Sequence, residues 1–474
     1  MLTQTHPAAQ QMHAQSTYGT DAPWAECVPL LNGSRQRYIN LDNAASTAPL
    51  PDVVDAINRF LPYYSSVHRG SGFKSRLSTA LYEEVHEIIG HFVGADLQTN
   101  TVIFGKNTTE AINKLAHRLD LPPNAIVVTT LLEHHSNDLP WRSRATVVHV
   151  HITPEGRLDE ADFDRTLAFY GKRVALVAVS GASNVTGFIQ PIHRLARKAH
   201  AVGARILVDA AQLAPHRPLV MKPDNDPEHL DFVALSAHKM YAPFGTGALV
   251  GPKQIFLQSA PEYQGGGTVD IVTRDRVYWT GLPDREEAGS PNVIGAVAMA
   301  AAAKLLMKQG MTEIAAQEMT LTSYALEQLH QVPGLVLYGE SDPAKVIERV
   351  GVIPFNLTGY PHALVAAILG YEGGIGVRNG CFCAHPYVVR LLKLNPTEQQ
   401  AWQQEILAGN KSRMPGMVRV SLGCQNTRAD IDHLVTLLQQ IVKGDFEGDY
   451  LVDRSTGDYH PIGYHDRWHE HFAF

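Results

Sequence analysis

The middle of the chain alternates between short β-branched segments and amphipathic segments, and this alternation constrains the fold more than any other feature. Between several of the β-branched runs the apolar positions recur at helical spacing, as in residues 191–203. Such alternation builds a mainly parallel sheet covered by helices on both faces. We therefore predict an α/β fold that binds its ligands at the carboxyl ends of the strands. The expected strands are 125–130, 145–152, 174–180, 204–211 and 231–237.

The pattern changes after about residue 295, where a smaller α+β domain is predicted. Its expected elements are helices at 295–309, 361–370 and 428–442 and strands near 335–338 and 351–357. With 474 residues the chain exceeds the usual size of a single hydrophobic core. We predict an N-terminal arm (1–37), a large domain (38–295), a smaller C-terminal domain (296–445) and a tail (446–474).

Composition excludes several classes of function. The net charge is −7, from 47 acidic and 40 basic residues spread along the chain, so no concentrated basic patch indicates a nucleic-acid partner. No apolar run approaches the length of a membrane helix, and the N-terminus lacks the pattern of a secretory signal. Four cysteines cannot form a disulfide scaffold in a chain of this length, which favours a reducing cytoplasm.

Polar and ionisable residues follow successive predicted strands. Each alone has an ordinary explanation: a helix cap, a turn, a solvated histidine or a surface lysine. Together, at one edge of one sheet, they predict a single crevice. Pyridoxal phosphate (PLP) requires a lysine, an acid, a phosphate cradle and a ring to stack on. The residues concerned are Asn107, Thr108, Thr109, His134, His135, Asn184, Asp209, Gln212, His238 and Lys239.

Eight stretches carry a resemblance to a known family. They are LDNAAST (41–47), VHRGSG (67–72), NTTEAIN (107–113), EHHSNDLPW (133–141), SNVTG (183–187), VDAAQ (208–212), SAHKMYAPFGTGAL (236–249) and EAGSPN (287–292). Residues 38–442 thus resemble the class V aminotransferases of PLP fold type I, and most of all the group II cysteine desulfurases and selenocysteine lyases. The resemblance implies a large domain with a mainly parallel seven-stranded sheet, a smaller C-terminal domain, PLP as cofactor, and a homodimer with shared active sites.

The resemblance also implies roles for individual residues. Lys239 would form the Schiff base and move the Cα proton, and Asp209 would keep the pyridine nitrogen protonated. His134 would stack on the ring and Gln212 would bind its phenolic oxygen. The phosphate would be held by Thr108, Thr109, Ser236 and His238, with Ser290 of the other subunit. The substrate, cysteine or selenocysteine, would be bound by Asn184, Arg378, His68 and Arg419. Arg378 would pair with its carboxylate, a task that suits a guanidinium better than an ammonium.

The loop from Arg378 to Ala384, Arg-Asn-Gly-Cys-Phe-Cys-Ala, indicates the reaction. In group II desulfurases the nucleophilic cysteine follows an arginine by five residues, which is the position of Cys383. A cysteine there would accept sulfur as a persulfide, whereas its ordinary alternative is a small buried hydrophobic residue. Cys381 is a resolving thiol, a second sulfur carrier or a filler. No metal site is expected, since two cysteines and His385 fall short of four ligands.

Several interpretations stay open. The first is a cysteine desulfurase that gives alanine and a persulfide on Cys383. The second is another reaction of the same cofactor: selenocysteine lyase, C–S lyase, epimerase or aminotransferase. The third is a non-catalytic scaffold, against which Lys239, Asp209 and Arg378 together argue. The Gly-Cys-Phe-Cys sequence and the long connection at 395–417 also resemble the desulfurase domain of molybdenum-cofactor sulfurases, so the sulfur acceptor, including an acceptor protein, is open. The four histidines of the tail indicate either a metal role or a tail that is mobile or packed on the dimer.

Overall fold

The structure is a computed structural model that describes residues 26–474. Most of the predicted N-terminal arm therefore lies outside the described residues. The described part of the arm forms a hairpin of β1 (Cys27–Pro29) and β2 (Arg35–Arg37). It is followed by β3 (Ile39–Asn40) and α1 (Pro51–Phe60).

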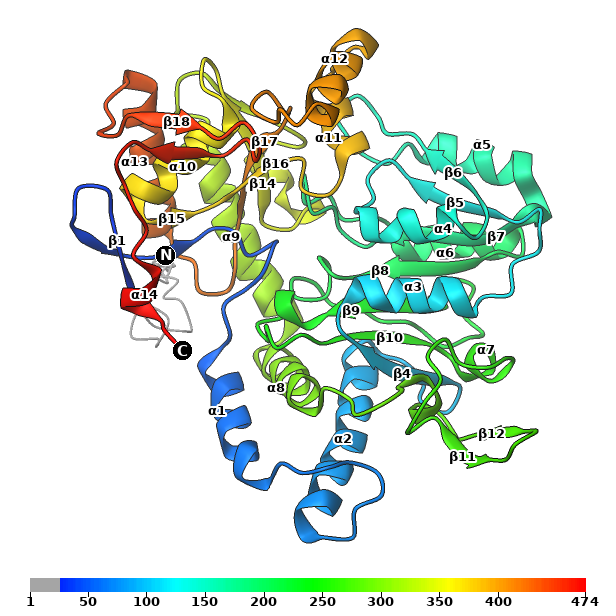
Figure 1. Ribbon diagram of the computed structural model, residues 1–474. Coiled ribbons are helices and arrows are strands. Elements are labelled where there is room, and N and C mark those ends of the chain that lie inside the picture. Colours follow the sequence, from blue (N-terminus) through cyan, green and yellow to red (C-terminus); the bar gives the residue numbers. More distant parts are fainter. Residues whose placement is uncertain (1–25) are drawn as a thin grey trace, which may run out of the picture.

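A seven-stranded sheet forms the centre of the larger half of the molecule (Figure 1). Its order is β4 (Asn100–Gly105), β10 (Gly247–Pro252), β9 (Phe232–Ser236), β8 (Arg205–Asp209), β7 (Val174–Ser180), β5 (Ile126–Thr130) and β6 (Thr146–Val150). Only β10 runs antiparallel to its neighbours; the other ladders are parallel. The predicted fold class and the mainly parallel seven-stranded sheet are confirmed.

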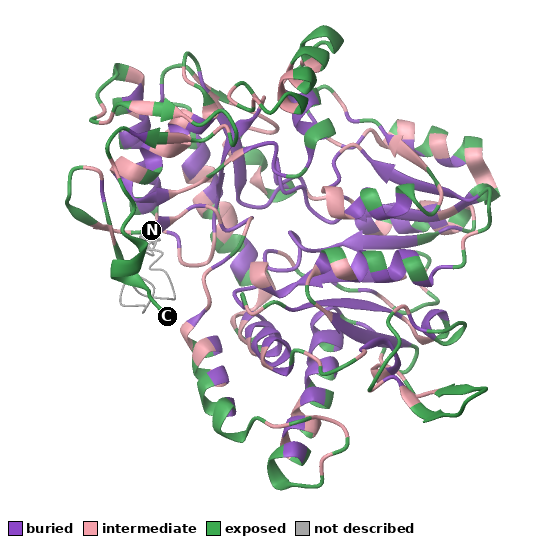
Figure 2. Cartoon of the chain, in the orientation of Figure 1, coloured by how far each residue is buried: buried purple, intermediate pink, exposed green. Residues whose placement is uncertain are grey.

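Helices cover both faces of this sheet, as the alternation of the sequence predicts. Along β7, Val177 and Val179 pack into one core, whereas Leu176 and Ala178 pack into the core on the opposite face. Both faces are therefore buried, which explains why the strands are almost continuously apolar (Figure 2). The first core also contains α2 (Phe73–Phe92), α5 (Glu160–Tyr170), α6 (Ile192–Ala201) and α8 (Val293–Gln309), and the second contains α3 (Thr108–Arg118).

A second, antiparallel sheet lies in the C-terminal part of the chain. Its order is β13 (Leu335–Leu337), β14 (Val352–Leu357), β17 (Met417–Ser421) and β16 (Arg378–Gly380). It shares a separate core with α9 (Met311–Leu329), α10 (His362–Gly373) and α13 (Arg428–Lys443). Ile39 and Leu41 belong to this core, because β3 pairs with β15 (Ile375–Gly376). The exact domain boundaries remain a prediction.

The shorter elements lie around these two sheets and their helices. They are α4 (Leu139–Arg142), α7 (Lys253–Leu257), α11 (His385–Leu391), α12 (Pro396–Leu407) and α14 (Trp468–His471), with hairpins β11–β12 (Val269–Val272, Val277–Trp279) and β18–β19 (Tyr450–Val452, Tyr459–Pro461). The tail folds against α10, where the Tyr450 hydroxyl donates to Glu372 over 2.7 Å. Within residues 26–474, no single helix has the length and apolarity to cross a membrane; α8 and α9 reach them only as a pair bent by 79°.

Candidate active site

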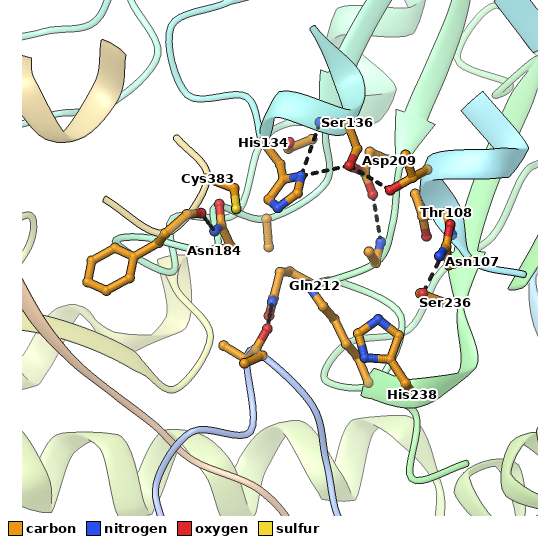
Figure 3. A pocket seen from close by; sticks show the side chains of 18 of the residues that line it. Asn107, Thr108, His134, Ser136, Asn184, Asp209, Gln212, Ser236, His238 and Cys383 are labelled. Atoms are coloured by element: carbon orange, nitrogen blue, oxygen red, sulfur yellow. Dashed lines mark hydrogen bonds between the residues drawn. The ribbon is translucent and has the colours of Figure 1, made fainter. Parts of the chain in front are cut away.

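A cavity of about 310 Å³ opens at the carboxyl ends of the parallel strands (Figure 3). It brings together most of the predicted site residues: Thr108, Thr109, His134, Asn184, Asp209, Gln212, Ser236, His238, Lys239, Arg378, Cys383 and Arg419. The reason is topological. Asp209 ends β8 and Ser236 ends β9, and the two strands are parallel neighbours, so both residues reach the same edge of the sheet.

The start of α3 forms one wall of the cavity. Asn107 caps the helix by accepting a hydrogen bond from the N–H of Glu110 at 3.0 Å. The Thr108 N–H lies 3.5 Å from Ser236 Oγ, and Thr108 Oγ1 is buried without a hydrogen-bond partner. A helix N-terminus with a free hydroxyl and N–H groups is suited to bind an anion such as a phosphate.

His134 stands beside this wall as a neutral ring. Its Nδ1 accepts a hydrogen bond from the N–H of Ser136 at 3.1 Å. Ser136 Oγ also bridges His134 Nδ1, at 3.0 Å, to Thr109 Oγ1, at 2.7 Å. Burial, reinforced by the positive charge of Lys239, lowers the pKa of His134 to about 3. The ring is therefore uncharged near neutral pH and can stack on a flat ligand. The sequence analysis did not single out Ser136.

Asp209 and Lys239 form the polar floor of the cavity. Asp209 is buried, which raises its pKa, and its Oδ1 accepts the N–H of Ala211 at 3.0 Å. Burial lowers the pKa of Lys239 to about 8, although Asp209 opposes this effect. Burial and Lys239 also lower the pKa of His238, to about 4. About a tenth of Lys239 is thus a neutral amine at pH 7, far more than for an ordinary lysine, and the neutral amine is the form that attacks an aldehyde.

Gln212 supplies a further unpaired atom. Its Nε2 donates to the carbonyl of Ala44 at 2.5 Å, whereas its Oε1 is buried without a partner. An unpaired buried polar atom is costly unless a ligand or water satisfies it. Gln212 Oε1 and Thr108 Oγ1 therefore mark two positions at which a polar ligand would be bound.

Two arginines meet one aspartate at the mouth of the cavity. Asp42 Oδ2 lies 2.8 Å from Arg378 Nη2, and Asp42 Oδ1 accepts a hydrogen bond from Arg419 Nη2 at 2.9 Å. Arg419 is 3% exposed and also donates to the carbonyl of Asn184 at 2.9 Å, whereas Arg378 is 51% exposed. Two guanidinium groups against one carboxylate leave a positive charge suited to a carboxylate ligand. Asp42 was not predicted as a site residue, although it lies in the LDNAAST stretch.

The Cys383 loop is attached to the large sheet through its own backbone. Asn184 Nδ2 donates to the carbonyl of Phe382 at 2.7 Å, and the His135 N–H donates to the carbonyl of Cys383 at 2.8 Å. Phe382 and Cys383 adopt φ values of +52° and +53°, a left-handed conformation that is strained for residues with a side chain. These contacts hold the exposed Cys383 thiol at the cavity.

Cys381 has a different environment from Cys383, two residues away. Its buried thiol donates to the carbonyl of Pro415 at 3.0 Å, within the long connection that contains α12. Burial raises the pKa of the Cys381 thiol to about 12. This thiol is therefore protonated near neutral pH and is a poor nucleophile in the observed conformation.

Two predicted residues lie outside the lining of the cavity. His68 Nδ1 lies 3.5 Å from Asp284 Oδ2, and Ser290 is exposed on the loop before α8. Neither residue reaches the cavity within a single chain. Their roles remain predictions, and that of Ser290 depends on a second copy of the chain.

A buried carboxyl group beneath His134 was also missed by the sequence analysis. Glu133 accepts hydrogen bonds of 2.7 Å from Thr130 Oγ1, Asn137 Nδ2 and Ser180 Oγ. Burial raises its pKa to about 7, although these hydrogen bonds oppose the shift. Because it joins the ends of β5 and β7 directly before His134, Glu133 acts as a positioning residue.

The fold and the site together define an enzyme of the aminotransferase type, with a lysine and a buried aspartate at the carboxyl edge of a seven-stranded α/β sheet. The chain belongs to the aminotransferase class-V family, whose sequence profile matches residues 39–434.

Individual relatives agree with this assignment. A cysteine desulfurase of Pectobacterium atrosepticum is 35% identical over 422 residues, which cover 87% of this chain and 94% of the relative. The apo structure of a cysteine desulfurase from Thermococcus onnurineus NA1 is 31% identical with a TM-score of 0.75, over 86% of this chain and 95% of that chain. The Escherichia coli cysteine desulfurase CsdA, solved as its S-sulfonic acid, is 27% identical with a TM-score of 0.70, over 86% and 95%.

Proposed function

We propose that this enzyme is a PLP-dependent cysteine desulfurase, which converts L-cysteine to L-alanine and retains the sulfur as a persulfide on Cys383. One observation carries the proposal: the exposed Cys383 thiol lines the same cavity as Lys239 and Asp209. The names of the relatives support the same reaction.

The residues of the cavity fit PLP. Lys239 would hold the cofactor through its aldehyde, and Asp209 would bind the pyridine nitrogen. The unpaired Oε1 of Gln212 and the unpaired hydroxyl of Thr108 would gain partners from the phenolic oxygen and the phosphate. When bound, PLP supplies an electron sink that makes the bonds at the substrate Cα labile.

Residues of the chain bind the substrate and transfer its Cα proton. Arg378 and Arg419 bind the substrate carboxylate and so orient the amino acid in the cavity. The amine of Lys239 removes the proton from Cα and returns a proton to the alanine product, which its pKa of about 8 permits near neutral pH. The carboxylate of Asp209 would keep the pyridine nitrogen of the cofactor protonated.

Sulfur transfer is assigned to Cys383. Its thiolate attacks the substrate sulfur, a new S–S bond forms, and the bond between that sulfur and the substrate Cβ breaks with its electron pair remaining on the carbon. Cβ takes up the proton lost by the substrate thiol and becomes the methyl group of alanine, and the persulfide remains on Cys383. A thiolate on an exposed loop can make this attack and then present the persulfide to an acceptor. The exposed thiol at the cavity favours this reaction over amino-group transfer, which needs no cysteine.

We also propose that the enzyme is a homodimer with shared active sites. Ser290 and His68 lie outside the cavity of their own chain and would reach that of the partner. All four cysteines lie within residues 26–474 and none forms a disulfide, which suits a reducing cytoplasm, where a persulfide would be passed to an acceptor thiol.

The direct test is to incubate the purified enzyme with L-cysteine, with and without a thiol reductant, and to measure alanine and sulfide. The proposal predicts equimolar alanine and reductant-released sulfide in the absence of a keto acid. Pyruvate and ammonia in place of alanine would indicate a C–S lyase, and alanine formed only from selenocysteine would indicate a selenocysteine lyase. Dependence on a keto acid would indicate an aminotransferase.

A further inference from the structure

A second cluster of ionisable side chains lies away from the cavity. His200 lies near the end of α6, and His229 and Asp231 directly precede β9. One potential ligand atom from each residue lies within 4.8 Å of the others. In the described part of the chain, no other group of three or more histidines, cysteines or acidic residues is arranged in this way.

Backbone contacts fix the orientation of both imidazole rings. Nδ1 of His200 lies 2.9 Å from the carbonyl of Pro227, and Nδ1 of His229 lies 2.7 Å from the carbonyl of Asp226. Because a carbonyl oxygen only accepts, each Nδ1 must carry the hydrogen. In a neutral ring the lone pair is then on Nε2. A metal-bound histidine has the same arrangement, with the other ring nitrogen donating to a carbonyl or carboxylate.

Both Nε2 atoms face the same carboxylate. His200 Nε2 lies 2.9 Å from Asp231 Oδ2, and His229 Nε2 lies 3.6 Å from Asp231 Oδ1. The N–H of Ile206 fixes the carboxylate by donating to Oδ2 at 2.8 Å.

The two rings stack with centroids 4.2 Å apart and an interplanar angle of 21°, so both Nε2 atoms lie on the same side of the carboxylate. A single divalent ion between the three groups would bind both imidazoles and the carboxylate at one centre.

We propose that His200, His229 and Asp231 bind a divalent transition-metal ion of the zinc type, with water as the fourth ligand. Zinc binds imidazole nitrogen and carboxylate oxygen at about 2.0–2.2 Å, so neighbouring ligand atoms of a tetrahedral site lie about 3.3 Å apart. The observed separations are of this size, 2.9 Å from His200 Nε2 to Asp231 Oδ2 and 3.6 Å from His229 Nε2 to Asp231 Oδ1, so each imidazole faces one oxygen of the carboxylate. The side chains are 19%, 19% and 11% exposed, which leaves one side open to water.

The site lies at the opposite edge of the sheet from the catalytic cavity. Asp231 precedes β9 and contacts the start of β8, whereas both strands end at the cavity, roughly 13 Å further along these five-residue strands. An ion here would join the end of α6 to the loop at 222–231 and to the first residues of both strands. Its role would be structural, in holding the strands that carry Asp209 and Ser236.

The test uses the full-length, tag-free, PLP-loaded protein in a Cys383→Ser background, so that zinc on this thiol is not counted. The protein is stripped with a chelator, zinc is added and excess is removed. We expect one zinc per chain by metal analysis and a higher Tm. His229→Gln should lose this equivalent and the rise in Tm. His193→Gln is the matched control and should keep both, because His193 lies on α6 with His200 and its Nδ1 also lies 2.9 Å from a backbone carbonyl, that of Glu228, but it is not part of the cluster.

A second measurement covers the case in which His229→Gln does not fold. X-ray absorption by zinc in the Cys383→Ser parent should show a shell of nitrogen and oxygen ligands with imidazole scattering and no sulfur. Equal zinc content in the His229→Gln protein and its parent, a sulfur shell, or zinc that neither stays bound nor raises the Tm would overturn the proposal. The last result would mean that the cluster is only an ion pair of protonated histidines.

Discussion

The floor of the cavity and the Cys383 loop differ in almost every physical respect. Asp209 and Lys239 lie at the ends of or directly after strands of the large sheet, where burial shifts the pKa of both. Cys383 instead lies on a loop of the C-terminal part, with an exposed thiol and a left-handed backbone. The two regions are joined by the hydrogen bonds that Asn184 and His135 donate to the loop carbonyls.

This difference indicates that the floor of the cavity carries out the chemistry at Cα and that the Cys383 loop carries out sulfur transfer. Groups that activate Cα must be preorganised and shielded from water, because electrostatic effects are strongest where reorganisation is small. A group that receives sulfur and passes it on must reach both the substrate and a second molecule. We therefore expect substitutions on the floor to slow all chemistry at Cα, and substitutions on the loop to affect sulfur transfer alone.

The largest expected effect is that of Lys239→Ala. The variant should lose the yellow absorbance of the lysine-bound cofactor and about ten-thousandfold or more in activity, about 5.4 kcal/mol of barrier. Lys304→Ala, which removes an exposed lysine paired with Glu84, should behave as wild type. Absorbance spectra and alanine formation provide the measurement, and a Lys239→Ala enzyme with both the spectrum and turnover would disprove the assignment.

Cys383→Ser should cost about a thousandfold in alanine formation from cysteine, about 4 kcal/mol, because a serine hydroxyl is a poor nucleophile toward sulfur. Binding of cysteine, measured by the change in the cofactor spectrum, should persist because Lys239 and Arg378 are unchanged. Selenocysteine cleavage should be less affected, since a selenol leaves more readily. Equal losses with both substrates would contradict a role confined to sulfur transfer.

Asp209→Asn should reduce activity about a hundredfold, or about 2.7 kcal/mol, because an amide cannot keep the ring nitrogen protonated. The variant should still fold and bind PLP, since Asn is similar in size and its oxygen can still accept the N–H of Ala211. Steady-state kinetics and cofactor content measure the two effects separately. A loss of only a few-fold would mean that Asp209 is not the acid that faces the nitrogen.

Cys381→Ser should have a smaller effect than Cys383→Ser, a few-fold at most in the first turnover. The Cys381 thiol is buried and protonated, and serine preserves its hydrogen bond to the Pro415 carbonyl. If Cys381 relays sulfur, slower sulfide release in repeated turnovers would reveal it. A complete loss of the first turnover would assign the nucleophile to Cys381.

The smallest expected effect concerns stability. Burial raises the pKa of Glu133 to about 7 in the folded state, above its usual value. The folded protein therefore binds this proton more tightly than the unfolded chain does. Protonated Glu133 contributes about 3 kcal/mol at most to the free energy of unfolding, and this contribution is lost as the pH rises through 7. The side chain of Glu133→Gln stays uncharged at every pH. The Tm of the variant minus the Tm of wild type should therefore increase from pH 6 to pH 8. Glu398→Gln on α12 should show no such trend, and parallel Tm curves for wild type and Glu133→Gln would contradict the shift.

Much of the fold could be predicted from the sequence because its patterns are local. The run at 174–180 became β7, and the runs at 204–211 and 231–237 became β8 and β9 with ends shorter by one or two residues. The last helix, expected at 428–442, spans Arg428–Lys443. The β11–β12 and β18–β19 hairpins were not anticipated, because strands this short and exposed carry no apolar alternation.

The site could be predicted only where its residues follow strands or lie in family stretches. The predicted residues that line the cavity do so because the strand ends converge, although their roles are still predictions. Asp42, Ser136 and Glu133 were missed, because their importance lies in contacts that sequence spacing does not reveal. The same holds for His200, His229 and Asp231, whose separation in the sequence matches no familiar ligand spacing.

The most direct test of the account is mass spectrometry of the wild-type enzyme after brief exposure to L-cysteine without reductant. Tryptic cleavage should give the peptide of residues 379–390, which contains both Cys381 and Cys383. We predict an addition of about 32 Da per sulfur, located by fragmentation on Cys383 and removed by reductant. Turnover of cysteine with no adduct on this peptide, or an adduct on Cys381 alone, would contradict the claim that Cys383 accepts the sulfur.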